Sequence, residues 1–246
     1  MSAPTPVVLA ALAFAALALG GCESTQEQSA KLEAAAKLEK REHPASADRG
    51  LSIAHPSTKV KVLEATVLHD AEGAAAAVTV ENISSQTLEA VPIAIAVKDS
   101  GGKLVYQNDA PGLEPSLTAI SRLPAHGSLT WVDDQIASAG GPSSVTATVG
   151  EAPAAKGPEP AIAVSGVHLS EPSTGEVAGT VRNGSTAAQA HLVVYVTATH
   201  SGRIVAAGRA VIAELAAGAS TGFQVFPIGS LSGAQLQASA PATASG

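Results

Sequence analysis

Cysteine, aromatic residues and basic residues are all scarce in this chain, and each scarcity excludes a class of protein. A single cysteine among 246 residues excludes an intrachain disulfide framework and a zinc site built from several thiolates. Aromatic residues make up 2 % of the chain, which leaves few rings to stack on bases. Lysine and arginine number 14 against 21 acidic residues, so the net charge of −7 argues against a nucleic-acid partner.

A long hydrophobic run is also missing, since a membrane-spanning helix needs about 20 apolar residues. The longest run here, Val7 to Leu19, has 13 residues and matches the apolar part of a secretory signal. Small residues and the single cysteine follow it directly, as Leu19-Gly20-Gly21-Cys22. This tetrapeptide resembles the lipobox of bacterial lipoprotein signals.

The lipobox resemblance implies a processing route and a location. Residues 1–21 would be the signal peptide, cut between Gly21 and Cys22, and the Cys22 sulfur would carry a diacylglycerol. Acylation of the new amino group would add a further chain, and two or more chains make a stable anchor. We therefore expect a protein anchored on the extracytoplasmic side of a cell membrane, with inner or outer membrane left open.

Residues 22–58 are predicted to be the lipidated cysteine and a stalk. Glu23 to Glu42 is rich in Ala, Glu and Lys, and Glu27–Lys31 is an i,i+4 pair in the favoured orientation. Pro44 would end a helix there. A helical spacer and a disordered tether both remain open.

The rest of the chain is an internal repeat. Asn82 and Asn183 are 101 residues apart, as are Gly101 and Gly202, and similar residues surround each pair. Further on, Leu123-Pro-Ala-His-Gly-Ser128 aligns with Leu215-Ala-Ala-Gly-Ala-Ser220, so the first copy carries an insertion within Tyr106 to Ser121. The repeat predicts two domains, 59–150 and 161–238, a Pro-rich linker at 151–160 and a flexible tail at 239–246.

Each copy has the pattern of a small antiparallel sandwich. Short β-branched runs such as Ile93 to Val97 alternate with small residues. Turn signals, Asn183-Gly184 among them, separate these runs at intervals typical of sandwiches. The predicted fold class is all-β, with two tandem immunoglobulin-like sandwiches and Trp131 and Phe223 as core aromatics.

Three features of the repeat resemble the FxLYD-type immunoglobulin-like domain of bacterial envelope lipoproteins. They are the Asn-x-Ser strand end at Asn183, the following strand and hairpin, and the segment from Leu215 to Phe223. His200 stands where that family has Asp. The resemblance implies a sandwich without catalytic residues.

Motifs that could carry catalysis lack their partners, so we expect no enzymatic activity. Gly218-Ala-Ser220-Thr-Gly222 fits the G-x-S-x-G pattern, but no Asp, Glu or His follows Gly222. Ser100-Gly-Gly-Lys103 fits S-x-x-K without its companion motifs, and both segments are predicted turns.

No metal or other cofactor is expected beyond the lipid on Cys22. The seven histidines show no metal-ligand spacing and are expected to be solvated or hydrogen-bonded; they are His43, His55, His69, His126, His168, His191 and His200. Asp133-Asp134 is predicted to be an exposed turn. Asn82-Ile-Ser84 and Asn183-Gly-Ser185 are formal glycosylation sequons but are predicted to act in turns.

The leading hypothesis is a non-enzymatic interaction or structural module, displayed to a protein or cell-wall partner. Sheet edges or loops would make the contact. The insertion is the predicted contact loop, with the candidates Tyr106, Asn108, Asp109 and Leu113. The alternative is a solute- or ligand-binding lipoprotein associated with a transporter, and an envelope hydrolase is a third hypothesis.

Overall fold

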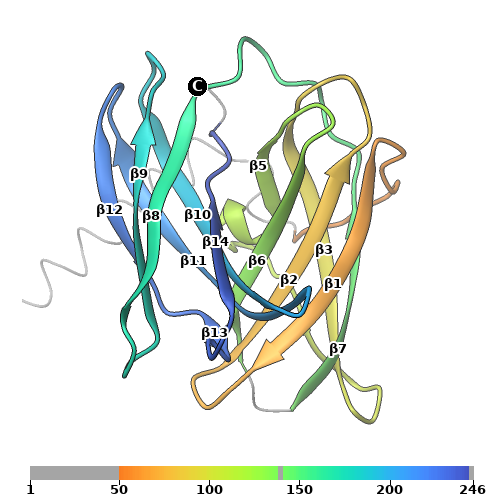
Figure 1. Ribbon diagram of the computed structural model, residues 1–246. Coiled ribbons are helices and arrows are strands. Elements are labelled where there is room, and N and C mark those ends of the chain that lie inside the picture. Colours follow the sequence, from red (N-terminus) through yellow and green to blue (C-terminus); the bar gives the residue numbers. More distant parts are fainter. Residues whose placement is uncertain (1–49, 138–140, 244–246) are drawn as a thin grey trace, which may run out of the picture. The chain divides into compact units, whose positions relative to one another are not determined.

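The computed structural model describes residues 50–137 and 141–243, which belong to one compact unit (Figure 1). The predicted signal peptide, Cys22 and the stalk up to residue 49 lie outside the described residues. All strand pairings between named strands are antiparallel, and the helical structure described is the 3₁₀ turn η1, Pro115–Leu117. The all-β sandwich prediction is confirmed.

The first sandwich is built from the first copy of the repeat. One sheet has the order β1-β2-β6, and in the other β3 pairs with β4, β5 and β7. The strands are β1 (Val60–His69), β2 (Ala74–Asn82), β3 (Leu88–Asp99), β4 (Leu104–Gln107), β5 (Ala119–Leu123), β6 (Ser128–Ile136) and β7 (Pro142–Val149). Trp131 on β6 is fully buried, as predicted.

The second sandwich repeats this plan with one simplification. Its sheets have the orders β12-β9-β8 and β13-β11-β10-β14. The strands are β8 (Ile162–Glu171), β9 (Glu176–Asn183), β10 (Gln189–His200), β11 (Arg203–Leu215), β12 (Ser220–Val225), β13 (Ile228–Gly229) and β14 (Gln235–Ser239). The long β11 pairs with β10 along its length, whereas in the first copy the insertion divides the equivalent strand into β4 and β5.

A buried asparagine organises the same corner of each sandwich. The Asn82 side-chain amide donates to the carbonyl oxygens of Gln86, Leu123 and Pro124 at 2.8, 3.1 and 3.0 Å. Its Oδ1 accepts from the backbone N–H and the hydroxyl of Ser84.

The second copy reproduces this network atom for atom. The Asn183 amide donates to Ala187, Leu215 and Ala216 carbonyls, and its Oδ1 accepts the two donors of Ser185. Both asparagine residues are 0 % exposed. Their amides are therefore structural, and the predicted turn role is confirmed for both sequons.

The two sandwiches also pack against each other, which the sequence analysis did not predict. In β10, Leu192, Val194 and Val196 face the core of the second sandwich, whereas Val193 and Tyr195 belong to the apolar cluster of the first. Strand β11 contacts β2 and β6 there, and β10 contacts β6. The sheet containing β10 is thus covered on both faces (Figure 1).

Small residues allow this close approach of sheets. Ala74, Ala75, Ala76 and Ala77 of β2 are all 0 % exposed. Their side chains are short, so neighbouring sheets can pack on both faces of this strand without overpacking. Ala207 and Ile228 of the second sandwich join the same cluster.

The expected linker follows the first sandwich closely. Its first half continues the line of β7 along β3: the Glu89 N–H donates to the Pro153 carbonyl and the Ala155 N–H to the Thr87 carbonyl. Its second half is held by the buried Arg122 guanidinium, which donates to the Lys156 carbonyl at 2.8 Å. Segment 151–160 is therefore packed on the first sandwich.

The described part of the expected tail is likewise packed rather than flexible. Ser239 ends β14, and Ala242 is 2 % exposed. The Ala242 carbonyl accepts the Ser121 hydroxyl, and the Thr243 N–H donates to Gln189. The polar, small-residue composition suggested fraying, but these contacts fix residues 239–243 between the two sandwiches.

Asn183→Ala should lower the free energy of unfolding, because it leaves buried carbonyls without donors, at about 1–3 kcal/mol for each group left unpaired. Urea unfolding of the full chain measures this. Ser185→Ala, which removes only the hydroxyl partner, should cost less. Equal stability of Asn183→Ala and the unmodified chain would contradict the structural role.

Candidate functional site

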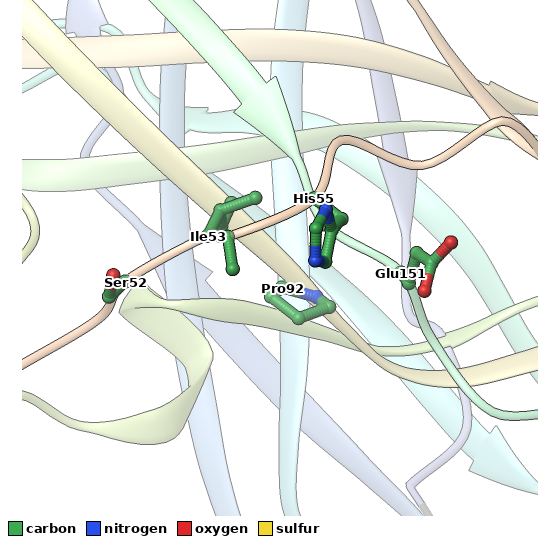
Figure 2. A pocket seen from close by; sticks show the side chains of 7 residues that line it. Ser52, Ile53, His55, Pro92 and Glu151 are labelled. Atoms are coloured by element: carbon green, nitrogen blue, oxygen red, sulfur yellow. The ribbon is translucent and has the colours of Figure 1, made fainter.

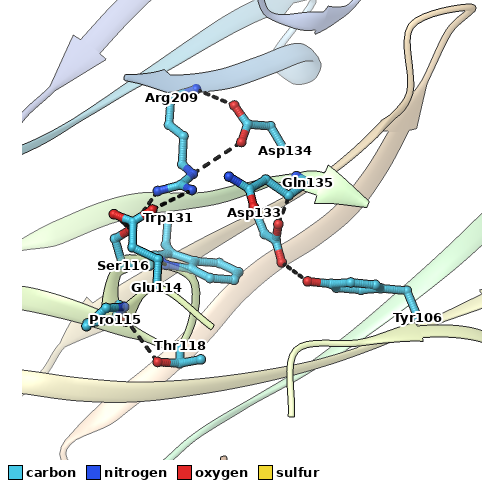
Figure 3. A network of polar contacts seen from close by, with 10 residues as sticks. All are labelled: Tyr106, Glu114, Pro115, Ser116, Thr118, Trp131, Asp133, Asp134, Gln135 and Arg209. Atoms are coloured by element: carbon cyan, nitrogen blue, oxygen red, sulfur yellow. Dashed lines mark hydrogen bonds and ion pairs between the residues drawn. The ribbon is translucent and has the colours of Figure 1, made fainter. Parts of the chain in front are cut away.

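The most heavily connected polar cluster lies where the two sandwiches meet. Its centre is Arg209, which projects from β11 toward the first sandwich (Figure 3). The Arg209 side chain is 3 % exposed. A guanidinium this deeply buried requires compensating charge and hydrogen bonds.

Arg209 obtains both from the first copy of the repeat. The Asp134 carboxylate on β6 accepts the Arg209 backbone N–H at 2.9 Å and its Nε–H at 3.2 Å. Glu114 accepts from Nη2 at 3.2 Å, and the Ser116 hydroxyl accepts from Nη1 at 2.6 Å. Each of the three guanidinium nitrogens therefore donates a hydrogen bond.

The insertion is built into this junction. The Ser116 hydroxyl donates to Glu114, and the Ser116 carbonyl accepts the indole N–H of Trp131 at 2.8 Å. Arg209 of the second copy and Trp131 of the first-copy core thus bind the same turn, η1 (Figure 3). The insertion therefore forms part of the contact between the two sandwiches, beside the apolar packing of β10 and β11.

A second polar pair lies beside the first. The Tyr106 hydroxyl donates to Asp133 Oδ2 at 2.7 Å, and the Gln135 N–H donates to Asp133 Oδ1. Burial raises the pKa of Asp133, although both hydrogen bonds work in the opposite direction. Burial raises the pKa of Tyr106 as well, so its phenol stays protonated and keeps donating.

The expectation of an exposed turn at Asp133-Asp134 was wrong. Both residues lie in strand β6, with Asp133 0 % exposed. The turn expectation rested on the absence of a calcium-binding loop pattern around these two carboxylates. What holds them in a strand is that each carboxylate has a donor from elsewhere in the fold, Tyr106 for one and Arg209 for the other.

The four predicted contact residues of the insertion separate into different roles. Asn108 is 0 % exposed; it accepts the Ile95 N–H and donates to the Ile93 and Leu117 carbonyls, so it cannot contact a partner. Tyr106 is half-buried and engaged with Asp133, and Leu113 is also half-buried. Asp109 is exposed and remains available for a contact.

Sequence reasoning missed Arg209, Glu114 and Ser116. One signal was present: β10 contains the uninterrupted apolar run Leu192 to Val196, and a run without alternation indicates burial on both faces. Such a strand requires a second partner layer. The run could have predicted the contact between sandwiches but not the arginine at its rim.

Two pockets are lined by residues other than those of the Arg209 cluster. One, of about 170 Å³, is open and is lined by Ser52, Ile53, Ala54, His55, Pro92, Gly150 and Glu151 (Figure 2). The other, of about 290 Å³, lies between the sandwiches and includes Arg122, Leu129, Ile162 and Pro241 in its lining. Both fall below the roughly 300–1,000 Å³ typical of ligand sites.

The motifs considered for catalysis and metal binding occupy local structure. Gly218 has a φ of 71° in the turn before β12, and Ser220 pairs with Arg182 at the start of that strand. The six described histidines are all exposed, and His43 lies outside the described residues. Within residues 50–137 and 141–243, no group of three His, Cys, Asp or Glu side chains could hold a metal ion.

No protein-family model matches the chain, and no curated protein matches it significantly. Of the described helical structure, nothing has the length and apolar character to cross a bilayer.

Arg209→Met should lower the free energy of unfolding by about 3 kcal/mol, because it leaves Asp134 and Glu114 without their cation. Both carboxylates are partly solvated, so the cost should lie toward the lower end for a broken buried pair. Urea unfolding measures the change. The matched control is Arg203→Met, at an exposed position of the same strand, which should cost little. Equal effects of the two substitutions would refute the junction.

Asp133→Asn should change how stability depends on pH. The folded-state pKa of Asp133 lies above its unfolded value, so its stabilising contribution is present at low pH and is lost as pH rises through the folded-state pKa. Asparagine stays neutral, so the variant should gain stability relative to the unmodified chain as pH rises above the ordinary Asp pKa of about 4. Thermal unfolding at a series of pH values above this pKa tests this, and a constant difference would contradict it.

Proposed function

We propose that this protein is a lipid-anchored bacterial envelope protein that displays a rigid pair of immunoglobulin-like sandwiches to a protein or cell-wall partner, without catalysis of its own. The location rests on Leu19-Gly20-Gly21-Cys22 directly after a 13-residue apolar run. Acylation of Cys22 would hold the chain at the extracytoplasmic face.

The junction at Arg209 is the observation that carries the display mechanism. The buried Arg209 donates hydrogen bonds both to β6 and to the insertion. These bonds restrain the second sandwich in one orientation on the first. Apolar cover between the sheets adds to this restraint. Surfaces on both sandwiches therefore keep a fixed spacing, which lowers the entropy lost when a partner binds both.

The small volumes of the two pockets favour display over solute delivery. A large thermal shift of the purified chain with a small molecule would instead support the alternative, a ligand-binding lipoprotein associated with a transporter.

The anchor is tested by membrane fractionation of cells that express the full chain or its Cys22→Ala variant. We expect the unmodified chain in the membrane fraction and the variant without the lipid-dependent mass increase, because the thioether cannot form. In-cell crosslinking followed by affinity recovery tests the display. A partner recovered with the unmodified chain and lost with Cys22→Ala supports it. An unlipidated Cys22 in the unmodified chain would refute the anchor.

A further inference from the structure

Strand β12 presents an unusual edge of the second sandwich. It ends the sheet β12-β9-β8, and in the described part of the chain its backbone pairs with β9 alone. An unpaired strand edge can accept a further strand, so most proteins block such edges with charges or bulges.

The other outer strands of the equivalent sheets carry those protections. Strand β1 has a register shift between Val62 and Glu64, with Lys61 nearby. Strand β8, at the opposite edge of the β12 sheet, has two shifts and a Gly166 φ of 63°. Strand β12 has no register shift and, from Ser220 to Val225, no charged residue.

The equivalent strand of the first copy, β6, has side-chain contacts to the insertion and to β11. Trp131 of β6 donates to the Ser116 carbonyl of the insertion, and Asp134 of β6 accepts from Arg209 of β11. The second copy has no counterpart of the insertion, since β11 continues unbroken where β4 and β5 are separate strands. Strand β12 therefore has no such segment beside it.

The side chains along this edge suit a neutral strand. Ser220, Gly222 and Gln224 are exposed on the outer face of β12. Phe226 follows them and is 60 % exposed, the highest value among the exposed large apolar residues described. An added strand would cover Phe226 and pair the free backbone groups, provided that it is itself extended, regular and uncharged.

Strand β12 of a second copy meets each of these requirements. We propose that two copies of this chain pair antiparallel through their β12 strands, around a two-fold axis. Such an interface is self-complementary, and β12 itself brings no charge to it, although each chain carries a net charge of −7. The nearest charged side chains lie on β9, where Glu176 accepts from Gln224 and Arg182 pairs with Ser220. Facing side chains in antiparallel strands share a face, so each Phe226 would lie over an outer-face residue of the other copy. The pairing does not depend on the lipid anchor.

Site-specific disulfide formation in the full chain tests the pairing. Gly222→Cys and Gln224→Cys, each made singly, should give reducible dimers in the oxidising envelope, because both positions lie beside the proposed axis. The unmodified chain shows whether Cys22 alone forms a disulfide-linked dimer. Ser165→Cys, on the exposed edge strand β8, is the matched control for a cysteine on another edge. Neither of these two chains should give the reducible dimer. Absence of the dimer at both β12 positions, an equal yield at Ser165→Cys, or crosslinks to a different protein would each overturn the proposal.

A charge placed on the edge provides the second test. A Cβ added at Gly222 meets nothing closer than the Gly179 carbonyl oxygen at 3.8 Å, so Gly222→Lys fits the folded chain. It should weaken dimerisation roughly tenfold or more, because like charges face each other across the paired strands. Gly222→Ala should retain the dimer.

Light scattering of the detergent-extracted full chain measures the mass, and thermal unfolding confirms that both variants are folded. A dimer that survives Gly222→Lys, or an unmodified chain that is monomeric at micromolar concentration, would overturn the proposal. Membrane fractionation of the same cells tests the lipid anchor separately. A failure of the dimer proposal can therefore be distinguished from a failure of the anchor proposal.

Discussion

Burial of both faces of the sheet containing β10 is the constraint on which the rest of the structure depends. Val194 and Val196 pack in the core of the second sandwich, whereas Val193 and Tyr195 pack in the apolar cluster of the first. A strand of this kind is stable only between two apolar layers. The second sandwich therefore lacks an independent outer surface on this side, and the tandem domains expected from the repeat are packed as one unit.

Charged side chains lie at the rim of this apolar contact. The Arg209 guanidinium of the second copy donates there to Asp134, Glu114 and the Ser116 hydroxyl of the first copy. Apolar contact alone is non-directional, whereas these hydrogen bonds have fixed geometry. The junction thus sets the orientation of one sandwich on the other, and the insertion in the first copy supplies half of its groups.

The two copies preserve the same internal corner and have diverged at their edges. Asn82 and Asn183 bond to equivalent carbonyls and to equivalent serines, because the same strand crossing must satisfy the same buried backbone groups. Outside this corner, the first copy has an insertion that divides β4 from β5, and the second keeps one long β11.

Local patterns in the sequence were enough to predict the strands, the turns, the repeat and the burial of Trp131 and Phe223. Strand periodicity and turn chemistry act between residues close in the chain, so a single sequence displays them. Contacts between distant residues decided the rest. Asn108 was predicted to contact a partner because it lies in the insertion, and long loops are often functional. Instead, its buried amide bonds to backbone groups of β3.

The same distinction separates the sequence from the tertiary structure in the candidate site. Composition by itself determined that the chain is acidic and has a single thiol, and the Leu19–Cys22 segment is the basis of the anchor that we propose. Only the folded chain decided that Asp133 and Asp134 are strand residues and that Arg209 meets Asp134 from 75 residues away. The physical reason is that burial depends on which surfaces meet in the folded chain. The cost of an unpaired charge depends on burial, so a local sequence pattern cannot predict it.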